Sequence, residues 1–476
     1  MIKQSKRVKI IATLGPASSS VDIIRLLIQQ GVNVFRLNFS HGDHATHKKA
    51  ITTIGQAAAA LGTEVGILAD LQGPKIRTRK TADDQPVTVT SGTRITITAR
   101  NNTCTDTVIA IDYPGIAEEI SKGQDILIND GAIQLKVTGK KANGDLSAIV
   151  VSGGDYSSRK GVNFPDVDLS IPSLTAKDRK DLSFIMKQDI QFVALSFVRK
   201  AEDITVLRKI LGKKAKHLKI IAKIEKPEAA RRIDAILKEV DGIMVARGDL
   251  GVEATPYAVP IIQKDLINKA NGAGKLVIVA TQMLESMINN VLPTRAESTD
   301  VANAIIDGAD AIMLSGETAM GKHPAEAVGT MSKIATADED SKYTRRKLVD
   351  HTIIERFPPH ALCEAAVWAG NDLGGLPLCV YTITGETALY LSKLRYNAPV
   401  YAFSPDMQVV RFLSMAWNIC SILLPFSENI VQLHTDGEEL LLKLKCIKKG
   451  DQIGIISGTN AIPGATNTFR IKMIGE

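Results

Sequence analysis

Charged side chains stand two residues apart near the ends of several apolar runs of this sequence. Lys223 and Glu225 end the run KIIAKIE, and Asp249 closely follows the next such run, GIMVARG. Residues two apart in a β-strand point to the same face of a sheet. Carboxylates from neighbouring strands suit a hard divalent ion, because Mg²⁺ commonly takes one or two carboxylates together with substrate oxygens. The pattern therefore predicts a metal site at Glu225 and Asp249.

Fixed cations accompany these carboxylates. Besides Lys223, the run VFRLNFS carries Arg36, Asn38 and Ser40, which are again two residues apart and share a face. A metal held by carboxylates and flanked by cations suits an anionic substrate whose charge shifts during reaction, as in phosphoryl transfer or enolate formation. Any one of these charges taken alone could also belong to a plain ion pair inside a barrel.

Eight apolar runs, most of them separated by helical patterns, must position these side chains. They are KIIATLG from Lys9, VFRLNFS from Val34, VGILADL from Val65, FVALSF from Phe192, KIIAKIE from Lys219, GIMVARG from Gly242, LVIVATQ from Leu276 and AIMLSGE from Ala311. Alternating strand and helix patterns favour a parallel sheet, and eight such units close a βα barrel, whose active site lies at the carboxyl ends of the strands. Further polar residues at these ends are Arg247, Asp70, Thr281, Gln282, Ser315 and Glu317.

The third and fourth runs are about 120 residues apart, far more than a crossover helix requires. Short β-branched runs with Gly and Asn-Gly turns fill this segment and predict a small all-β domain. Because both of its ends enter at one barrel loop, we expect it to move as a lid. The next helix is expected to begin between Leu174 and Asp178.

A third unit follows from about residue 346. It predicts helices LCEAAVWAGNDL, ETALYLSKLR and DMQVVRFLSMAWN, and strands PLCVYTI, PVYAFS, IGIISG and TFRIKMIG. We expect an α/β domain with a mixed sheet and with Trp368 and Trp417 in its core. The predicted fold is thus an α/β protein, a (β/α)8 TIM barrel (residues 1–71 and 171–345) with an inserted all-β lid domain (72–170) and a C-terminal α/β domain (346–476).

Composition excludes several other classes. The net charge of +7 comes without basic tracts, and aromatic residues make up only 4% of the chain, so nucleic-acid binding is not expected. Five scattered cysteines form no Cys-x-x-Cys pair, which indicates a reducing cytoplasm rather than disulfides or a zinc ribbon. The apolar run near the amino terminus is too short for export or for crossing a membrane.

Two further motifs give weaker evidence for a functional site. The histidines of HGDHATH, which are His41, His44 and His47, could bind a metal, but exposure in a loop or at a helix start is the simpler interpretation. The segment GAGKL near Gly272 lacks a glycine and the Ser or Thr of a phosphate-binding loop, so we discard that reading.

The strand ends resemble those of pyruvate kinase in order and wording. The matching segments, which cover all three units, are TLGPAS, RLNFSHG, ADLQGPKIR, KGVNFP, AKIEKPEA, MVARGDLGVE, ATQMLESM, PTRAESTDVANA and LSGETAMGKHP. The resemblance implies transfer of the phosphoryl group of phosphoenolpyruvate to ADP, giving pyruvate and ATP, the last step of glycolysis. It also implies a homotetramer.

The resemblance assigns roles by position. Lys223 would stabilise charge on the transferring phosphoryl group, Arg36 would contact phosphate, and Glu225 and Asp249 would bind Mg²⁺ or Mn²⁺. Thr281 would be linked to protonation of the enolate, either directly or through a relayed water.

Other implied positions concern the substrates and the lid. Backbone amides beside Arg247, Gly248 and Asp249, at a predicted helix start, would hold the carboxylate of phosphoenolpyruvate. Asp130, in the lid's NDG turn, would close toward the site. The positions that match nucleotide-binding residues are Pro16, Asn38, His41, Arg77 and Lys160.

The segment ADLQGPKIR departs from the family pattern. Many members read Asp-Thr-Lys-Gly-Pro-Glu-Ile-Arg here, and potassium sits among residues that match Asn38, Ser40, Asp70 and the backbone of Leu71. This chain has Lys75 in place of that Glu, as do family members active without potassium. We expect the Lys75 ammonium to sit near Asp70, where at about 4 Å the attraction is worth roughly 1 to 4 kcal/mol, and potassium to be unnecessary. The alternative is that Lys75 points to solvent.

The last unit resembles the family's effector domain. Its segment TITGET matches a phosphate-binding loop, with Thr382, Thr384, Gly385, Glu386 and Thr387 as candidate effector residues, and SGTNAIPGATNT resembles the facing loop. The Glu386 carboxylate would oppose a doubly phosphorylated sugar, so we expect a sugar monophosphate or similar activator rather than fructose 1,6-bisphosphate. Alternatively, Thr384 or Thr387 only caps a helix.

Two rival functions remain. An aldolase with Lys223 as a Schiff base predicts borohydride trapping and no metal requirement, and the nearby Glu225 and Asp249 oppose the lowered lysine pKa that it needs. A sensor of phosphoenolpyruvate or of an effector predicts missing catalytic positions, but Lys223, Glu225, Asp249 and Thr281 are all present.

Overall fold

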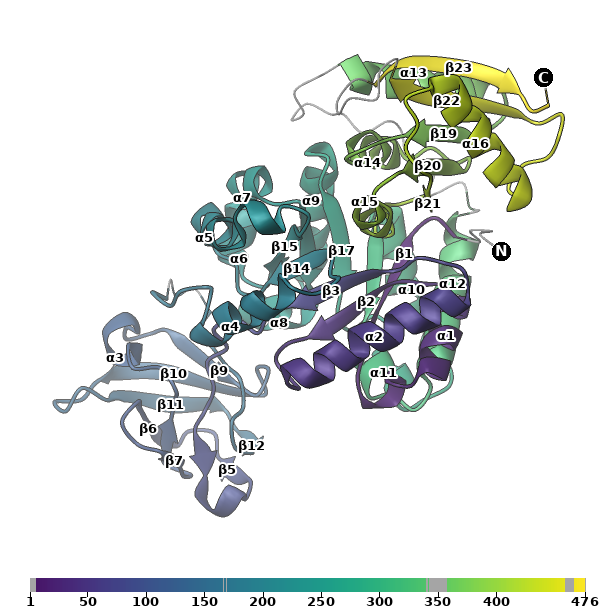
Figure 1. Ribbon diagram of the computed structural model, residues 1–476. Helices are drawn as coiled ribbons and strands as arrows, with labels where there is room; N and C mark the ends of the chain where they lie inside the picture. Colours follow the sequence, from purple (N-terminus) through teal and green to yellow (C-terminus); the bar gives the residue numbers. More distant parts are fainter. Residues whose placement is uncertain are drawn as a thin grey trace.

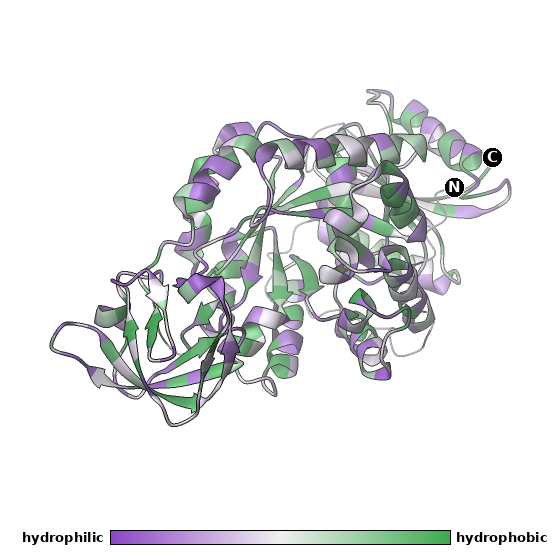
Figure 2. Ribbon diagram, turned by 90° about the horizontal axis from the view of Figure 1, so that it is seen from below, coloured by the Kyte–Doolittle hydropathy of each residue, from purple (hydrophilic) through white to green (hydrophobic). Residues whose placement is uncertain are grey.

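The chain folds into a barrel that lies between a sheet domain and an α/β domain (Figure 1). The structure is a computed structural model that describes residues 6–165, 167, 169–339, 341, 358–458 and 466–475. The sheet domain and the α/β domain lie on opposite sides of the barrel in both ribbon views (Figures 1 and 2).

Eight parallel strands close the barrel, in the order β1-β18-β17-β16-β15-β14-β3-β2. They are β1 (Lys9–Thr13), β2 (Val32–Asn38), β3 (Gly66–Asp70), β14 (Phe192–Leu195), β15 (Lys219–Ile224), β16 (Gly242–Ala246), β17 (Leu276–Ala280) and β18 (Ala311–Leu314). All eight predicted runs form these strands. Most of their residues are buried on both faces, as parallel barrel strands require, and they are largely green in Figure 2.

Helices surround the barrel or extend its loops. They are α1 (Val21–Gln30), α2 (His44–Ala60), α4 (Ala176–Ile185), α5 (Ala201–Leu211), α6 (Pro227–Arg231), α7 (Ile233–Glu239), α8 (Arg247–Glu253), α9 (Val259–Gly272), α10 (Arg295–Asp307), α11 (Gly316–Ala319) and α12 (Pro324–Glu339), with short 3₁₀ turns η1 (Pro16–Ser18), η3 (Lys213–Ala215) and η4 (Glu285–Ile288).

Local signals set several helix ends. α4 starts where predicted, because Thr175 and Asp178 form a capping box. Thr294 and Glu297 cap α10 in the same way. Gly31 caps the carboxyl end of α1, and its φ of 114° is a left-handed conformation that glycine adopts without strain.

The inserted segment forms the predicted all-β domain, which we call the lid. Its elements are β4 (Lys80–Thr81), η2 (Ala82–Asp84), β5 (Val87–Val89), β6 (Arg94–Thr98), β7 (Thr103–Cys104), β8 (Val108–Ala110), α3 (Ile116–Glu119), β9 (Asp125–Ile128), β10 (Ile133–Lys140), β11 (Leu146–Ser152), β12 (Gly154–Tyr156) and β13 (Val162–Asn163). Six strands form its main sheet, in the order β13-β9-β10-β11-β6-β8, around a separate apolar core.

The C-terminal unit is an α/β domain with a five-stranded sheet in the order β21-β20-β19-β22-β23. Its elements are α13 (Pro358–Asp372), β19 (Leu378–Tyr381), α14 (Glu386–Lys393), β20 (Val400–Ser404), α15 (Met407–Leu413), β21 (Ile419–Leu423), α16 (Ile430–Lys443), β22 (Gln452–Gly458) and β23 (Thr466–Met473). The sheet is mixed, as predicted, because only β22 and β23 pair antiparallel.

Two predictions for this domain are wrong. Trp368 is 60% exposed on α13, since the opposite face of that helix buries Cys363, Ala366 and Val367. Trp417 is buried as expected but lies in a turn after α15, which ends at Leu413. There the side chain of Asn418 donates hydrogen bonds to two backbone carbonyls and holds the turn. Strand β21 and helix α16 were not predicted.

The C-terminal domain closes the amino-terminal end of the barrel. One apolar cluster joins interior barrel residues such as Phe192 to residues such as Phe412 on α15, and the centroids of these two rings lie 6.0 Å apart. The carboxyl ends of the strands therefore face away from this domain, toward the lid (Figure 1). The predicted domain boundaries stay predictions, and the one at 345/346 lies outside the described residues.

Candidate active site

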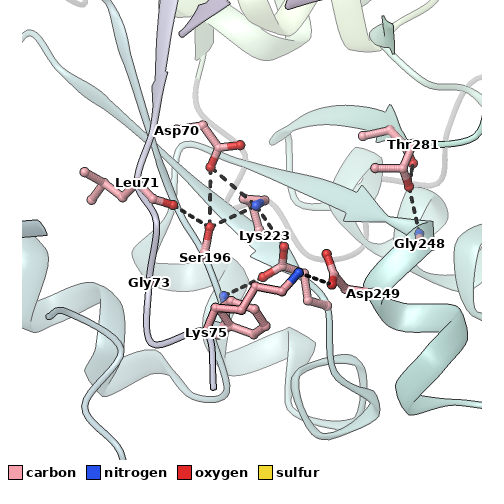
Figure 3. A network of polar contacts seen from close by, with 12 residues as sticks. Asp70, Leu71, Gly73, Lys75, Ser196, Lys223, Gly248, Asp249 and Thr281 are labelled. Atoms are coloured by element: carbon pink, nitrogen blue, oxygen red, sulfur yellow. Dashed lines mark hydrogen bonds and ion pairs between the residues drawn. The ribbon is translucent and has the colours of Figure 1, made fainter. Parts of the chain in front are cut away.

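Four charged residues from three strands or their ends meet at the mouth of the barrel. The Arg36 guanidinium of β2 donates to Asp70 Oδ2 at the end of β3 over 2.7 Å. The Lys223 ammonium of β15 lies 3.4 Å from Asp70 Oδ1 and 2.8 Å from Glu225 Oε1 (Figure 3). Parallel strands bring these residues together because their carboxyl ends share one rim. Three residues of the predicted site, Arg36, Lys223 and Glu225, thus come together here with Asp70, while the fourth, Asp249, lies in the first turn of α8.

The neighbouring strand β14 adds two contacts that the sequence analysis missed. The Ser196 hydroxyl donates to the Leu71 carbonyl over 2.7 Å and accepts from Lys223 over 2.9 Å. The backbone amide of Phe197 donates to Glu225 Oε2 over 2.6 Å. Ser196 belongs to the predicted run FVALSF and directly follows the last residue of β14, so its position at a strand end was a signal that could have found it.

Burial and neighbouring charges oppose each other at these groups. Burial alone would raise the pKa of Asp70, but the Lys223 and Arg36 cations hold it below its ordinary value. Burial would lower the pKa of Lys223, but Asp70 and Glu225 raise it above its ordinary value. Burial raises the pKa of Glu225, with Lys223 opposing and Asp249 contributing. Lys223 is therefore a permanent cation in this site, which is unsuited to Schiff-base formation.

Lys75 does not pair with Asp70, contrary to our prediction. Its ammonium lies 3.5 Å from Asp249 Oδ1 (Figure 3), and its side chain is 31% exposed, so it does not point only to solvent either. Asp70 is 1% exposed and already contacts Arg36 and Lys223. The backbone also turns just before Lys75, where the Lys75 amide donates a hydrogen bond to the Gly73 carbonyl. Lys75 thus reaches α8 instead of β3.

Glu225 and Asp249 are chemically suited to a divalent ion. Both are hard oxygen donors, one buried and one 29% exposed, and each faces an ammonium group, Lys223 or Lys75. Within the described part of the chain, no group of three or more His, Cys, Asp or Glu side chains is arranged to hold a metal. A metal bound here would therefore complete its shell with substrate or water oxygens.

Thr281 lies at the end of β17 in a strained backbone conformation. Its φ is 70° and that of Gln282 is 53°. Such values are rare for a β-branched residue, cost on the order of 1 to 3 kcal/mol, and cluster at functional sites. The Arg247 guanidinium donates to both of their carbonyls and pairs with Asp300, which holds the strained segment in place.

The Thr281 hydroxyl also contacts α8. It accepts a hydrogen bond of 2.7 Å from the amide of Gly248 (Figure 3) and donates one of 2.6 Å to the Ala280 carbonyl. α8 begins at Arg247, as the sequence predicted. The Gly248 amide expected at the phosphoenolpyruvate carboxylate is thus engaged by Thr281 in this structure.

The candidate nucleotide residues form two groups. Pro16 and His41 are exposed in the loops after β1 and β2. Arg77 and Lys160 lie on adjacent lid segments, joined by the Arg77–Gly161 bridge and by a 2.8 Å bond from the Thr78 amide to the Lys160 carbonyl. No hydrogen bond or ion pair among the described residues joins the two groups.

Asn38 and Ser40 are half-buried and joined to each other. Asn38 is paired with Asp70 in the strand register, and its side-chain oxygen accepts a 3.1 Å hydrogen bond from the Ser40 amide. Together with Asp70 and the Leu71 carbonyl, they match the positions where the sequence resemblance places potassium in many other family members.

The lid turn Asn129–Asp130–Gly131 lies beside the site. A Cβ placed on Gly161 would be 3.9 Å from both Asp130 Oδ1 and Lys75 Nζ. A Cβ on Gly131 would be 3.9 Å from the side chain of Val252 on α8. The turn thus approaches both Lys75 and α8.

The remaining candidate side chains are held by contacts with the surrounding protein. Glu317 accepts hydrogen bonds from the amides of Leu284 and Ser315. His44 pairs with Asp181, and His47, against our expectation of exposure, is buried and stacks on a phenylalanine ring.

The predicted effector loop forms the start of α14. Thr382 Oγ1 accepts from the amide of Gly385 over 3.0 Å, and Thr384 Oγ1 accepts from that of Glu386 over 3.4 Å, which agrees with the helix-cap alternative. The Thr387 hydroxyl lies 3.1 Å from that of Thr466, in the facing loop. Residues 459–465 of that segment lie outside the described residues.

Comparison with known proteins decides the family. The family model "Pyruvate kinase, barrel domain" matches residues 5–328, and "Pyruvate kinase, alpha/beta domain" matches residues 360–472. This chain belongs to the pyruvate kinase family. Pyruvate kinase 2 of Synechocystis sp. is 42% identical over 473 residues, which cover 98% of this chain and 79% of that protein. The pyruvate kinase of Mycobacterium intracellulare is 40% identical over 473 residues, 99% of each chain. That of Geobacillus stearothermophilus is 40% identical over 475 residues, 99% of this chain and 81% of that protein.

Membership in the pyruvate kinase family confirms the predicted fold and enzyme class. The chain is a phosphotransferase of this family, and the aldolase and sensor interpretations are set aside. None of the helices in the described ranges combines the length and hydropathy needed to cross a bilayer.

Proposed function

We propose that phosphoryl transfer from phosphoenolpyruvate to ADP takes place at the barrel mouth, between Lys223 and the two carboxylates Glu225 and Asp249. The observation that carries this assignment is the Lys223 ammonium, held 2.8 Å from Glu225 and 3.4 Å from Asp70. A cation fixed in this way needs no reorganisation when charge shifts onto the transferred group.

Lys223 and Arg36 bind the phosphoryl oxygens and stabilise their charge in the transition state. That transition state is loose, so positioning and electrostatics provide most of the catalysis. Thr281, fixed by Gly248 and by the Arg247 clamp, orients the proton delivered to the enolate, through its own hydroxyl or a water that it holds.

Glu225 and Asp249 hold Mg²⁺ or Mn²⁺, which when bound neutralises charge on the phosphoryl oxygens. The nucleotide lies between Pro16, Asn38 and His41 of the barrel and Arg77 and Lys160 of the lid. Closure of the lid with Asp130 excludes water that would otherwise hydrolyse the transferred group.

A coupled assay of pyruvate formation tests this proposal. The wild-type protein should form pyruvate from phosphoenolpyruvate and ADP only with Mg²⁺ or Mn²⁺. Asp249→Asn and Glu225→Gln should both weaken Mn²⁺ binding, measured by electron paramagnetic resonance, and lower the rate. Unchanged Mn²⁺ binding in both variants would refute the metal site, and trapping of Lys223 by borohydride with substrate would restore the aldolase interpretation.

Potassium is not required for this activity, in our proposal. Lys75 adds an internal ammonium beside Asp249, and Arg36 and Lys223 already neutralise Asp70. At about 4 Å, such a charge contributes roughly 1 to 4 kcal/mol. Equal rates with and without potassium, at constant ionic strength, would support this assignment.

The loop from Thr382 to Thr387 binds a sugar monophosphate that activates the enzyme. Exposed Glu386 disfavours a second phosphate, while the loop's hydroxyls and amides can bind one anion. A sugar monophosphate should lower the KM for phosphoenolpyruvate, fructose 1,6-bisphosphate should not, and Glu386→Ala should reduce this discrimination. If neither sugar acts, the loop is only a helix cap.

The enzyme assembles as a homotetramer and works in the cytoplasm, without nucleic acid or membrane partners. Large apolar side chains exposed on the barrel (Ile261 at 68%, Leu292 at 74%) and on the C-terminal domain (Trp368 at 60%) support burial against further copies. Light scattering behind gel filtration would measure the subunit number.

A further inference from the structure

A buried carboxylate at the end of α8 joins the lid to the barrel. Glu253 is 6% exposed and is the last residue of α8. Its Oε1 accepts a 2.8 Å hydrogen bond from the side-chain amide of Asn163, in lid strand β13, and lies 3.0 Å from the Lys226 ammonium of the barrel. One oxygen atom is therefore shared by a lid side chain and a barrel side chain.

Both barrel residues of this contact lie close in the chain to a proposed metal ligand. Lys226 directly follows Glu225, and α8 runs from Glu253 back to Asp249 in its first turn. α8 has seven residues and is about 10 Å long, so a shift at one end displaces the other. The Glu253 contact is thus mechanically connected to both carboxylates.

The lid side of the contact leads to the Asp130 turn. Asn163 pairs with Leu127 of β9, and the Asn129 amide beyond β9 donates to the Gly161 carbonyl over 3.0 Å. Gly131 of the same turn faces Val252, the neighbour of Glu253. A small cavity lined by Lys75, Asn163, Lys226 and Glu253 marks the same junction between lid and barrel.

The geometry points to Glu253, Asn163 and Lys226 as positioning residues that couple the lid to the spacing of Glu225 and Asp249. Mg²⁺ demands near-ideal octahedral geometry, so small displacements of its carboxylates change its affinity. When the lid and α8 are joined, the carboxylates hold the spacing that the metal needs, and when the joint is broken they drift apart. The inference rests on the proposed metal site and adds a means by which the lid controls it.

Mn²⁺ binding to the full-length enzyme, measured by electron paramagnetic resonance without substrates, tests the coupling. Asn163→Ala removes the lid link but leaves Glu253 paired with Lys226, and it should weaken Mn²⁺ binding about tenfold, the lower end of the effect of removing a residue that orients metal ligands from outside their shell. Glu253→Gln should have a similar effect, because it leaves Lys226 without its counter-charge. In kinetics, both variants should require more metal, while the KM for phosphoenolpyruvate at saturating metal stays within about twofold.

Two double-variant experiments, an exchange of the two side chains and a double-mutant cycle, distinguish loss of the lid coupling from general damage to the fold. The double variant Asn163→Asp with Glu253→Gln restores one carboxylate and one amide at the junction, and it should bind Mn²⁺ within about threefold of wild type. In a Glu253→Ala background, where the acceptor of the Asn163 hydrogen bond is gone, Asn163→Ala should add almost nothing further.

Ser158→Ala is the matched control. Ser158 makes hydrogen bonds within the lid, to the Thr81 amide over 2.9 Å and to Asp84 over 2.6 Å, so its loss perturbs the lid without touching α8. It should leave Mn²⁺ binding unchanged.

Three results would overturn the inference, namely unchanged Mn²⁺ affinity in Asn163→Ala, full additivity in the cycle, or an equal loss in Ser158→Ala. The metal site itself is judged separately by Asp249→Asn. If that variant weakens Mn²⁺ binding while Asn163→Ala does not, only the coupling fails, and if neither does, the proposed metal site fails.

Discussion

Lys223 is positioned by atoms on three sides, and only some of them could be read from the sequence. The spacing of Lys223 and Glu225 predicted their shared face, but the ion pair of Arg36 with Asp70 was not predicted. The direction of Lys75 could not be predicted, because it depends on a turn and on which carboxylate is already occupied. Side chains on loops are placed by tertiary contacts that leave no periodic signal.

Lys223→Met should lower kcat by about 10² to 10³, the usual cost of removing one preorganised group that stabilises transition-state charge. The KM for ADP should change little, because the nucleotide residues lie elsewhere. The coupled pyruvate assay measures both. Lys223→Arg keeps the charge and should retain more activity than Lys223→Met, whereas equal losses in the two variants would mean that the charge is not what matters.

Lys75→Glu should create a need for potassium. The change replaces the ammonium beside Asp249 with a carboxylate, so the site gains a demand for an external cation. We expect the rate without potassium to fall at least about tenfold, because the change removes one attraction and adds one repulsion near 4 Å, which together exceed the roughly 1.4 kcal/mol of a tenfold effect. Added potassium should restore most of it.

Lys80→Glu is the control for this change in net charge. Lys80 is 55% exposed in the lid, where it pairs only loosely with Asp84. It should remain independent of potassium. A wild-type enzyme that itself loses most activity without potassium would contradict the assignment of Lys75.

At the scale of elements, periodic burial explains which parts could be predicted. The barrel strands were found because most of their residues are buried, so their apolar runs are nearly continuous. Helix α16 was missed because Asp436 and Gly437 interrupt its pattern, and Gly437 is there because the Tyr381 hydroxyl would lie only 2.3 Å from a Cβ. Tertiary packing overrides helix propensity where a neighbouring element requires a small residue.

The docking of α14 on the barrel depends on a buried charge cluster. Asp310, just before β18, is fully buried, pairs with Lys393 of α14 and lies 3.0 Å from Arg395. Asp310→Asn should therefore destabilise the enzyme by about 3 to 5 kcal/mol, because it leaves two buried cations without their counter-charge. Urea unfolding followed by circular dichroism measures the loss.

Asp22→Asn removes an exposed partner of Arg25 and serves as the control, with little change expected. A variant carrying Asp310→Asn, Lys393→Met and Arg395→Met together should recover part of the stability, since this uncharged set leaves no buried cation without a counter-charge. A loss in Asp310→Asn no larger than that in Asp22→Asn would contradict this account.

At the scale of the whole molecule, the two ends of the barrel have different tasks. The lid lies at the end that carries the charge cluster described above, and the C-terminal domain closes the other end with an apolar core that continues the barrel interior (Figure 1). Ionisable groups buried at the closed end affect the pH dependence of folding rather than the chemistry of the site. Lys6 is one of them, because its ammonium donates to Asn33 Oδ1 over 2.8 Å and faces Lys9 and Glu339.

Burial, with Lys9 adding to it and Glu339 opposing, lowers the pKa of Lys6 to about 7, against an ordinary value of 10.5. The folded chain therefore releases this proton above about pH 7, while the unfolded chain keeps it until about pH 10. Since the unfolded state then binds more protons, stability rises with pH in this window. We expect the free energy of unfolding to increase by about 1 to 2 kcal/mol between pH 7 and pH 8.5.

In Lys6→Met, where no proton is bound in either state, much of this rise should disappear and the enzyme should be more stable than wild type at pH 7. Lys48→Met, at an exposed position on α2, should keep the wild-type slope. Urea unfolding of the three proteins at both pH values measures the difference, and parallel slopes for wild type and Lys6→Met would show that Lys6 remains charged at the closed end of the barrel.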